Sequence, residues 1–399
     1  QAGEKLFSLP PAALLTVNAL QKLYPMHFQR GKNVSGLSSI QFLVMHLFLH
    51  SQSAAPLPMT SDFEPYIASL PSDFSYHPLT WLASPEPTTR LLTRSLPRVI
   101  RAAVDAVEAR VTQDWNAVLD LLVSVATETF LVISLNCLKN LGQHAILRSP
   151  TSGWRAAQPP DFLWAWLCVN TRSVYCRLSA AREEDNIALC PLLDFANHSN
   201  VVNVGTCVPS FLAPHSMIAG EEVYLNYGPH PDWKLFVEYG FLTGADGRAE
   251  LDIGPELEEL FLNDTAGVSK RRHLESSGYW GEWTLHLLPT PHPSFRTMSA
   301  LRCLRLDATS CSTFTKWDKT ILGLSDVVDP LNEELSRTTL EGLCTSIISE
   351  TDVSVDALTR DFRSYSNLKD QVSTVRALWN ERKTVASAVL MACRRGDEF

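Results

Sequence analysis

The stretch from Cys190 to Phe241 constrains the fold more than any other part of the chain. Strand-like apolar runs alternate there with short polar groups, Asn-His-Ser at 197–199 and Asn-Tyr-Gly at 226–228. Polar side chains between buried strands are common in binding and catalytic sites, because the strands hold them in fixed positions. We therefore expect a small β-rich core that carries a functional site in this stretch.

The regions on either side have a helical pattern. Apolar residues recur at helical spacing through most of the span from Ser35 to Val174, including a compact helix at Phe162–Val174 that ends near Arg172. The expected strands are Glu4–Pro10, Ile187–Leu193, Val201–Val208, Phe211–Ile218 and Glu222–Tyr227. The expected C-terminal helices are Glu256–Asn263, Ala300–Leu306, Pro330–Ile348 and a long segment at Thr351–Cys393. Together these elements predict an α+β protein.

Composition limits the classes of protein to which the chain can belong. With 399 residues, of which 45% are apolar and 19% charged, the chain can bury a sizeable core in two or three domains, or in one domain with a large insertion. Its formal net charge of -9 argues against a general nucleic-acid binder, which needs a basic face. The nine cysteines show no CxxC spacing, so we expect free, buried thiols rather than a disulfide framework or a zinc cluster.

One segment is apolar and long enough to raise the question of a membrane span. Leu119–Leu138 contains Asp120, Glu128 and Asn136, which are costly at the centre of a bilayer, so we expect a buried helix instead. The opening residues, QAGEKLFSLPP, include an acidic residue and two prolines and do not resemble a signal peptide. Because the first residue is not methionine, we expect a processed or incomplete chain. The expected compartment is the cytoplasm, with the nucleus as the second choice.

Each polar motif has an ordinary structural explanation when it is taken alone. The NHS segment could cap a helix, and the GEEVYLNYG segment could be a strand with aromatic core residues. Cys190, Asp194 and His198 are spaced four apart and could bind a metal if they lay on a helix. Pro191 and the strand-like run around it disfavour that helix, and nothing in the sequence marks Cys190 as an exposed, activated thiol. We therefore expect neither a metal site nor a cysteine nucleophile.

The order of three motifs is far more specific than any one of them. LLDxxNHS, GEEVxxNYG and LFxEYGF follow one another between residues 192 and 241, and in this order they resemble the SET-domain protein lysine methyltransferases. The resemblance is stronger to the Rubisco large-subunit methyltransferase-like branch, whose SET domain is split by a long helical insertion. Four further stretches resemble that branch, namely GEKLFSLP, PYIASLPSDFSYHPLTW, WLCVNTRSVYC and LLPTPHPSFRTMSALRCLRL.

The resemblance implies an α+β fold in which a β-rich SET fold is split by a helical insertion and followed by an all-helical domain. We expect the SET domain at 1–250, with the insertion at about 36–165, and a helical substrate-binding domain at 251–399. The family transfers a methyl group from S-adenosyl-L-methionine to a lysine side chain. The implied partner is a lysine-bearing protein, and we expect a monomer that binds no nucleic acid, membrane or metal.

The resemblance also assigns a cofactor site to four residues. Arg172 matches the family arginine that meets the methionine carboxylate of the cofactor through a charge-assisted contact. Asp194 matches an acidic residue that supports this part of the site. Asn197 and His198 match the positions that hold the adenine and the amino-acid end, partly through backbone groups.

Three aromatic residues match the family's catalytic and substrate-binding positions. Tyr227 matches the catalytic tyrosine at the methyl-transfer pore, whose hydroxyl can orient the methyl group through weak CH···O contacts. Tyr239 and Phe241 match aromatic walls of the lysine channel. An apolar channel beside a cationic sulfonium lowers the pKa of a lysine, which explains why such a site has no obvious strong base.

Two features depart from the family pattern. The family has a Gly-x-Gly turn just before its first strand, and this chain begins at Gln1 inside the next element, so either the chain is a fragment or its cofactor binding is impaired. The segment from Ser199 to Gly220 is short and offers only Phe211, where the family has a further aromatic residue that touches the substrate. Two alternatives therefore stay open: a non-catalytic SET-like scaffold that binds a protein partner, and methylation of a histidine rather than a lysine.

Overall fold

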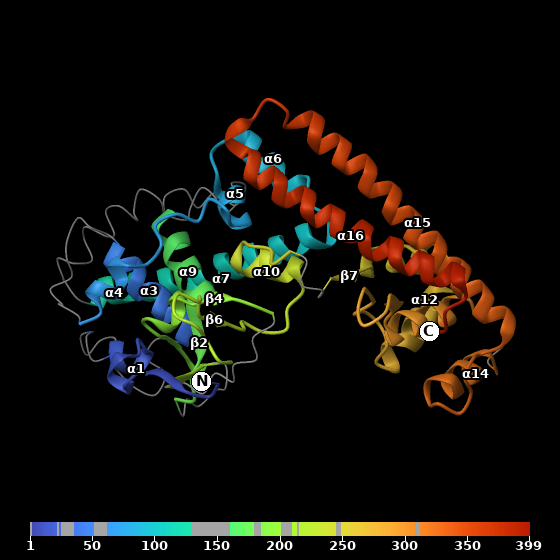
Figure 1. Cartoon of the computed structure of the whole chain (residues 1–399), viewed down its shortest axis with the longest axis horizontal. Helices are drawn as coiled ribbons and strands as arrows, with labels where there is room; N and C mark the ends of the chain where they lie inside the picture. The colour runs from blue at the N-terminus through green and yellow to red at the C-terminus, as the bar shows by residue number, and fades with distance from the viewer. Residues whose placement is uncertain are drawn as a thin grey trace. The chain divides into compact units, whose positions relative to one another are not determined.

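A computed structural model gives the three-dimensional structure of the chain (Figure 1). Contacts divide the chain into two compact units. The first comprises Gln1–Ala83, Val104–Pro229 and Glu238–Gly240, and the second comprises Ser84–Ala103, His230–Val237 and Phe241–Phe399. The structure describes residues 2–21, 24, 36–51, 62–128, 160–178, 185–200, 210–213, 215–244, 249–307 and 312–399.

The first unit contains three short strand pairs that join distant parts of the sequence. The pairs are β1 (Lys5–Ser8) with β5 (Ser210–Leu212) and β2 (Ser173–Tyr175) with β3 (Ile187–Leu189), both antiparallel, and β4 (Asn197–His198) with β6 (Tyr224–Leu225), which is parallel. A buried apolar cluster packs against them, made of Leu9, Leu14, Cys176, Ala188, Cys190, Leu193, Phe211 and Leu225. This is the β-rich core that the sequence predicts, although the predicted strand at Val201–Val208 lies outside the described residues.

Helices of the first unit pack around a shared carboxylate. Asp114 of α7 (Arg98–Glu128) accepts a hydrogen bond from Gln41 of α3 (Ser39–Ser51) at 2.8 Å and another from the indole of Trp166 of α9 (Pro160–Arg172) at 2.8 Å. In α3 eight consecutive residues from Phe42 to Leu49 are buried, so the helix is covered on all sides. The remaining elements of this unit are η1 (Pro11–Ala13), α1 (Val17–Gln21), α4 (Glu64–Ala68), α5 (Pro78–Ala83) and η4 (Leu193–Phe195).

The apolar stretch Leu119–Leu138 is described only in part. Its first residues continue α7 to Glu128, and residues 129–138 lie outside the described part of the chain. Among the helices that the structure describes, none combines the length and the hydropathy of a membrane span.

The second unit is mainly helical and is built on two long helices that run side by side, α15 (Pro330–Asp361) and α16 (Lys369–Arg395) (Figure 1). Asp329 caps α15, because its side chain accepts a hydrogen bond from Asn332 N, and Gly396 ends α16 with a φ of 81°. The other elements are α6 (Pro87–Arg94), α10 (Asp232–Tyr239), β7 (Glu250–Asp252), α11 (Gly254–Asn263), α12 (Gly267–Ser276), β8 (Thr284–His286), β9 (His292–Pro293), α13 (Phe295–Leu304), α14 (Ser312–Ile321) and η5 (Ser366–Leu368). The last two residues of α10, Glu238 and Tyr239, belong to the first unit.

Two predictions for this unit are wrong in detail. The predicted helix boundary between Ile348 and Thr351 does not exist, since α15 continues to Asp361 and the break lies between α15 and α16. The region after residue 250 is also not all helical, because β7, β8 and β9 form a three-stranded antiparallel sheet. Strands of two or three residues are too short to leave a periodic signal in the sequence.

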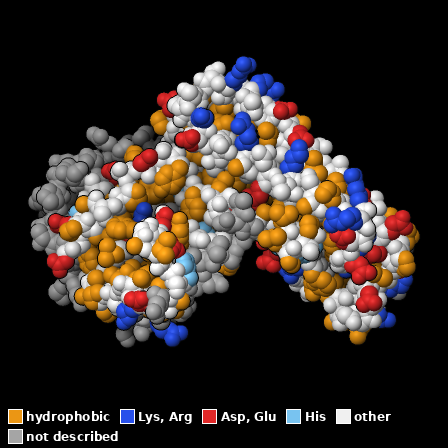
Figure 2. All heavy atoms as spheres, in the orientation of Figure 1, with side chains coloured by type: hydrophobic (Ala, Val, Ile, Leu, Met, Phe, Trp, Pro, Cys, Tyr) orange, Lys and Arg blue, Asp and Glu red, His pale blue; other side chains and the backbone are white. Residues whose placement is uncertain are grey.

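On the face drawn in Figure 2, basic and acidic side chains are interspersed over this unit.

Candidate active site

Helix α9 ends at Arg172, whose guanidinium holds the turn that follows β3. Arg172 Nη1 donates to the backbone oxygen of Asp194 at 2.8 Å and lies 3.4 Å from Asp194 Oδ2. The Asp194 side chain is fully buried, and that of Arg172 is 22% exposed. A guanidinium that contacts both the backbone and the carboxylate of one residue fixes its position, since both contacts are charge-assisted.

The turn from Cys190 to Ala196 brings Asp194 into the interior. Asp194 N donates to Cys190 O at 3.1 Å, and Ala196 N donates to Leu193 O at 3.1 Å. Leu192 has a φ of 74°, a conformation that residues other than glycine adopt rarely and at a cost. The predicted strand at Ile187–Leu193 therefore ends early, at Leu189, because the chain must turn to place Asp194.

Tyr66 of α4 completes the surroundings of Asp194. Its hydroxyl donates to Asp194 Oδ2 at 2.8 Å. Burial raises the pKa of Asp194, while the hydrogen bond from Tyr66 and the charge of Arg172 oppose that rise. Asp194 Oδ1 and Arg172 Nε are buried and have no hydrogen-bond partner among the described residues. Because buried polar atoms are rarely left unsatisfied, this pair keeps hydrogen-bonding capacity for one further donor and one further acceptor.

The parallel pair β4–β6 carries Asn197 and His198. Asn197 Nδ2 donates to Glu222 Oε1 at 2.6 Å. His198 Nδ1 accepts a hydrogen bond from Tyr227 N at 3.0 Å, and its Nε2 lies 3.1 Å from Asn200 Oδ1. Since a backbone N–H can only donate, Nδ1 carries no proton, and Nε2 donates to the amide oxygen. His198 is therefore a neutral link between β4 and the residues that follow β6.

Tyr227 and Tyr239 form an aromatic pair beside this link. The Tyr227 hydroxyl donates to Ala196 O at 2.8 Å, and its ring centre lies 5.1 Å from that of Tyr239. Burial raises the pKa of Tyr227 to about 12, and burial also raises the pKa of Tyr239. Both hydroxyls are therefore protonated at neutral pH, so the pair is an apolar wall with hydrogen-bonding ends and not a general base.

The structure brings six of the seven predicted site residues together in the first unit through a continuous series of contacts. Phe241 belongs to the second unit and is half-buried, so its place in the site stays a prediction. The six residues are Arg172, Asp194, Asn197, His198, Tyr227 and Tyr239.

Several curated proteins are similar to this chain in sequence. No family model matches the chain. A region of 244 residues is 32% identical to SET domain-containing protein 4 of Mus musculus, covering 57% of this chain and 53% of the mouse protein, so the chain spans about half the length of that relative. The Homo sapiens protein of the same name is 27% identical over 403 residues, which cover 97% of this chain and 82% of the human protein. Ribosomal lysine N-methyltransferase set11 of Schizosaccharomyces pombe is 29% identical over 166 residues, which cover 40% of this chain and 41% of that protein.

A solved structure has the same fold. The structure of Rubisco LSMT bound to sinefungin and monomethyllysine matches 100% of this chain and 83% of its own with a TM-score of 0.55 and 18% sequence identity. In sequence the chain is similar to SET-domain proteins, and it has the fold of Rubisco LSMT. The predicted resemblance to SET-domain proteins and the predicted α+β fold are thereby confirmed.

Cys190 does not act as a nucleophile in the candidate site. Its side chain is fully buried in the apolar cluster under the strands. Its sulfur lies 3.9 Å from that of Cys176, and this contact, with burial, raises the pKa of the Cys190 thiol. A thiol that is protonated and screened from solvent is a poor nucleophile.

Among the described residues, no three His, Cys, Asp or Glu side chains are grouped so that they could hold a metal ion.

Sequence reasoning missed Tyr66 as a site residue. The PYIASLP segment that contains it shows only a general resemblance to the family, because nothing local connects a tyrosine on a short helix to a carboxylate 128 residues later. The sequence signal that could have identified Tyr66 is the Pro65-Tyr66 pair in the first turn of α4. A proline in the first turn fixes the start of that helix, and so fixes where the following tyrosine lies.

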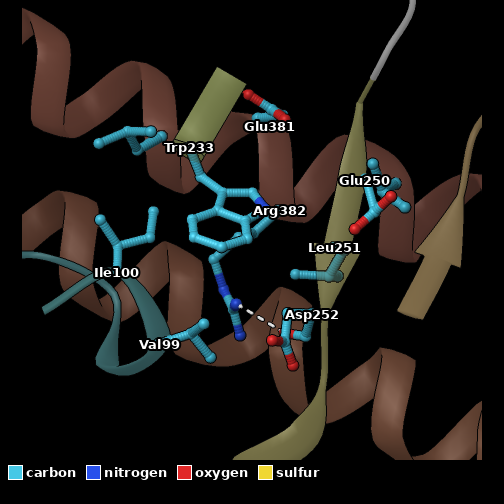
Figure 3. A pocket seen from close by; sticks show the side chains of 10 residues that line it. Val99, Ile100, Trp233, Glu250, Leu251, Asp252, Glu381 and Arg382 are labelled. Atoms are coloured by element: carbon cyan, nitrogen blue, oxygen red, sulfur yellow. Dashed lines mark hydrogen bonds between the residues drawn. The ribbon is translucent and has the colours of Figure 1, made fainter. Parts of the chain in front are cut away.

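The second unit has a small cavity of its own (Figure 3). Its volume is about 20 Å³, which is room for roughly one water. Trp233 lies at its centre, next to Glu381 and Arg382, and the indole Nε1 and Arg382 Nε have no hydrogen-bond partner among the described residues. Burial raises the pKa of Glu381 to about 8, and repulsion from Asp232 adds to that rise. This cavity is too small for a cofactor and suits a single bridging water.

Proposed function

We propose that this protein transfers a methyl group from S-adenosyl-L-methionine to the side-chain nitrogen of a lysine in another protein. The observation that carries the proposal is the contact network in which Arg172 holds the turn of Asp194 and Ala196, and Ala196 in turn binds Tyr227 of the Tyr227–Tyr239 wall. A relative named ribosomal lysine N-methyltransferase and a similarly folded protein bound to sinefungin and monomethyllysine support it.

The described residues fit the amino-acid end of this cofactor. The Arg172 guanidinium, whose side chain is 22% exposed, can donate to the carboxylate of an α-amino acid, and its contacts with Asp194 hold it in place. The neighbouring backbone of Asn197 and His198, fixed by pairing with β6, is positioned to hold the remainder. When bound, the cofactor supplies a methyl group on a cationic sulfonium.

Tyr227 would keep the reacting atoms aligned. Its hydroxyl donates its single proton to Ala196 O, so the oxygen can act only as an acceptor towards any further group. An acceptor oxygen favours weak CH···O contacts with a methyl group that carries positive charge. Holding both reactants in line converts an encounter between two molecules into a step within one complex, which accounts for much of the rate of such enzymes.

The tyrosine wall would also prepare the lysine. Free lysine has a pKa of about 10.4, so its nucleophilic neutral form is scarce at neutral pH. The partly buried rings of Tyr227 and Tyr239 disfavour the ammonium form, and this lowers the pKa of a lysine placed beside them. Since both hydroxyls stay protonated, the proton leaves to solvent and not to the wall.

The proposal is tested on the full-length gene product. Binding of S-adenosyl-L-methionine is measured by calorimetry, and transfer is measured with a methyl-labelled cofactor on a cytosolic protein extract. Tyr227→Phe should lower transfer by about 100-fold or more, while cofactor affinity stays within about twofold of wild type. Absence of both binding and transfer in the wild type would contradict the proposal and favour the scaffold alternative. Equal transfer by Tyr227→Phe would contradict the role given to Tyr227.

A further inference from the structure

A tyrosine from the segment before α5 lies directly on the backbone next to the aromatic pair. A Cβ atom added at Gly240 would meet the Tyr76 ring at 2.8 Å and 3.1 Å and the His77 Cα at 3.0 Å. Gly240 follows Tyr239, whose ring centre is 5.1 Å from that of Tyr227. The Tyr76 ring therefore covers the glycine of the YGF motif and lies next to the wall formed by the other two tyrosines.

The segment that carries Tyr76 is held firmly in place. His77 is fully buried, and its Nε2 lies 3.3 Å from Glu238 O at the end of α10. Burial lowers the pKa of His77 to about 4, so the ring is neutral, and Leu79 N donates to its Nδ1 at 3.2 Å. Nε2 therefore carries the proton and donates to the Glu238 carbonyl.

Two more hydrogen bonds close this segment on itself. Thr80 Oγ1 donates to Phe74 O at 2.8 Å, and the Trp81 indole donates to Ser75 O at 2.8 Å. A side chain held by a segment with this many internal bonds meets a ligand without a large ordering cost.

Tyr76 differs from its neighbours in exposure. Phe74 is 5% exposed and His77 is fully buried, whereas Tyr76 keeps 44% of its surface exposed. The charge of Arg172 lowers the pKa of Tyr76 against the rise that burial causes, and Tyr76 in turn raises the pKa of Tyr227. Tyr76 therefore interacts electrostatically with Arg172 and Tyr227, and part of its surface is unoccupied by protein.

Between Ser199 and Gly220, where the family has an aromatic residue that touches the substrate, this chain has no aromatic side chain free to do so. Phe211 carries the only phenyl ring in that segment. It is 3% exposed, belongs to the apolar cluster, and stacks on Phe7 with ring centres 5.4 Å apart. Phe211 is therefore a core residue, and an aromatic contact to the substrate must come from another part of the chain.

We propose that Tyr76 forms a wall of the lysine channel and helps to select the methyl-accepting side chain. The helical insertion would then supply an aromatic surface that the short Ser199–Gly220 segment lacks. An aromatic face attracts an ammonium or methylammonium group through its quadrupole and offers apolar contact to the lysine methylenes. This inference rests on the proposed function, because it assumes that the channel beside Tyr227 accepts a lysine.

The test measures binding of two probes to the full-length protein. The first probe is sinefungin, and the second is Nε-monomethyl-lysine added at saturating sinefungin. Tyr76→Ala should weaken methyl-lysine binding by about threefold to tenfold, the range for one aromatic contact, and leave sinefungin affinity within about twofold. Tyr76→Phe keeps the ring and should bind both probes like the wild type.

Matched variants separate this role from a purely structural one. Tyr365→Ala removes a similarly exposed tyrosine, 41% exposed, from the second unit and should change neither affinity. If Tyr76→Ala lowers the melting temperature strongly, Tyr76→Leu keeps apolar cover over Gly240 while removing the ring, and the same loss of methyl-lysine affinity is expected.

Three results would overturn the inference. The first is that Tyr76→Ala loses as much affinity for sinefungin as for methyl-lysine, which would place Tyr76 on the cofactor side. The second is that Tyr76→Ala leaves the affinity for both probes unchanged. The third is that the wild type binds sinefungin but no methyl-lysine. A wild type that binds no sinefungin contradicts the proposed function itself, so the two failures are distinguishable.

Discussion

The Tyr66 hydroxyl donates a 2.8 Å hydrogen bond to Asp194 Oδ2 across 128 positions of the sequence. This bond joins the helical insertion to the turn of the β-rich core that carries most of the candidate site. It also acts on the same carboxylate as Arg172, which contacts Asp194 at the backbone and at Oδ2. Tyr66, from the predicted insertion, is therefore in direct contact with the candidate site.

Tyr66→Phe should weaken cofactor binding. Without the hydroxyl, a buried carboxylate loses one of its donors, its pKa rises further, and its hold on Arg172 loosens. We expect the Kd for S-adenosylhomocysteine to rise by about tenfold, the lower end for a hydrogen bond to a charged group. The measurement is calorimetry. Tyr24→Phe is the control, because it removes another buried hydroxyl. The Tyr24 hydroxyl bonds to His46 Nδ1 at 2.9 Å and not to Asp194. Equal effects of the two variants would contradict the prediction.

Arg172 and Asp194 should be strongly coupled in stability. Arg172→Met leaves a buried carboxylate without its cation, which we expect to cost about 3 kcal/mol of unfolding free energy at pH 7. Adding Asp194→Asn removes the orphaned charge and should recover part of that loss. Urea denaturation of the wild type, both single variants and the double variant measures the coupling. Additive losses would show that the two side chains do not depend on each other.

Acid should partly rescue the Arg172→Met variant. The pKa of Asp194 is already raised by burial, and loss of the guanidinium raises it further. A carboxyl group whose pKa is raised by folding binds its proton more tightly in the folded state, so its destabilising effect grows as pH rises through that range. We expect the unfolding free energy of the variant to approach that of the wild type as the pH is lowered from 7 towards 5. A constant difference between them over this range would contradict the assignment.

Glu381 should make the second unit less stable as pH rises. Its pKa is about 8 in the folded chain, against an ordinary value of 4.5, so between these values the folded state holds a proton that the unfolded state has released. Unfolding free energy should therefore fall by about 3–5 kcal/mol as the pH rises from about 4.5 to about 8. Glu381→Gln should abolish this dependence. Glu334→Gln, an exposed change of the same kind on α15, should leave it intact. A wild-type profile that is flat over this window would count against the prediction.

Gly240 should tolerate no side chain. Its φ of 84° disfavours any L-residue, and a Cβ atom would also press on the Tyr76 ring and the His77 backbone. We expect Gly240→Ala to cost about 2–4 kcal/mol of unfolding free energy, from backbone strain and overpacking together. Gly220→Ala isolates the first contribution, since Gly220 has a φ of 89° with nothing within 4 Å of its added Cβ, and should cost about 1–2 kcal/mol. Thermal melting of both variants provides the comparison, and equal losses would mean that the Tyr76 contact carries no energy.

Local patterns in the sequence were enough to predict much of this protein. The end of α9 at Arg172 follows from helical spacing. The polar group at 226–228 follows a strand that is real, though shorter than expected, whereas Asn197 and His198 form the strand β4 themselves. The order of the three central motifs is specific enough to indicate the family. Where local patterns failed, the elements were too short, as in β7–β9, or continuous where a break was expected, as in α15. Neither case leaves a distinct periodic signal.

The sequence by itself determined the fold class, the family and the residues that the motifs carry, because those depend on spacing along one stretch of chain. Only the tertiary structure decided which other residues meet Cys190–Phe241. Tyr66 reaches Asp194 and Tyr76 covers Gly240 because the insertion folds back onto the turn and onto the end of α10. Contacts between residues more than a hundred positions apart are set by how helices and strands pack, and packing is not written in the period of any single segment.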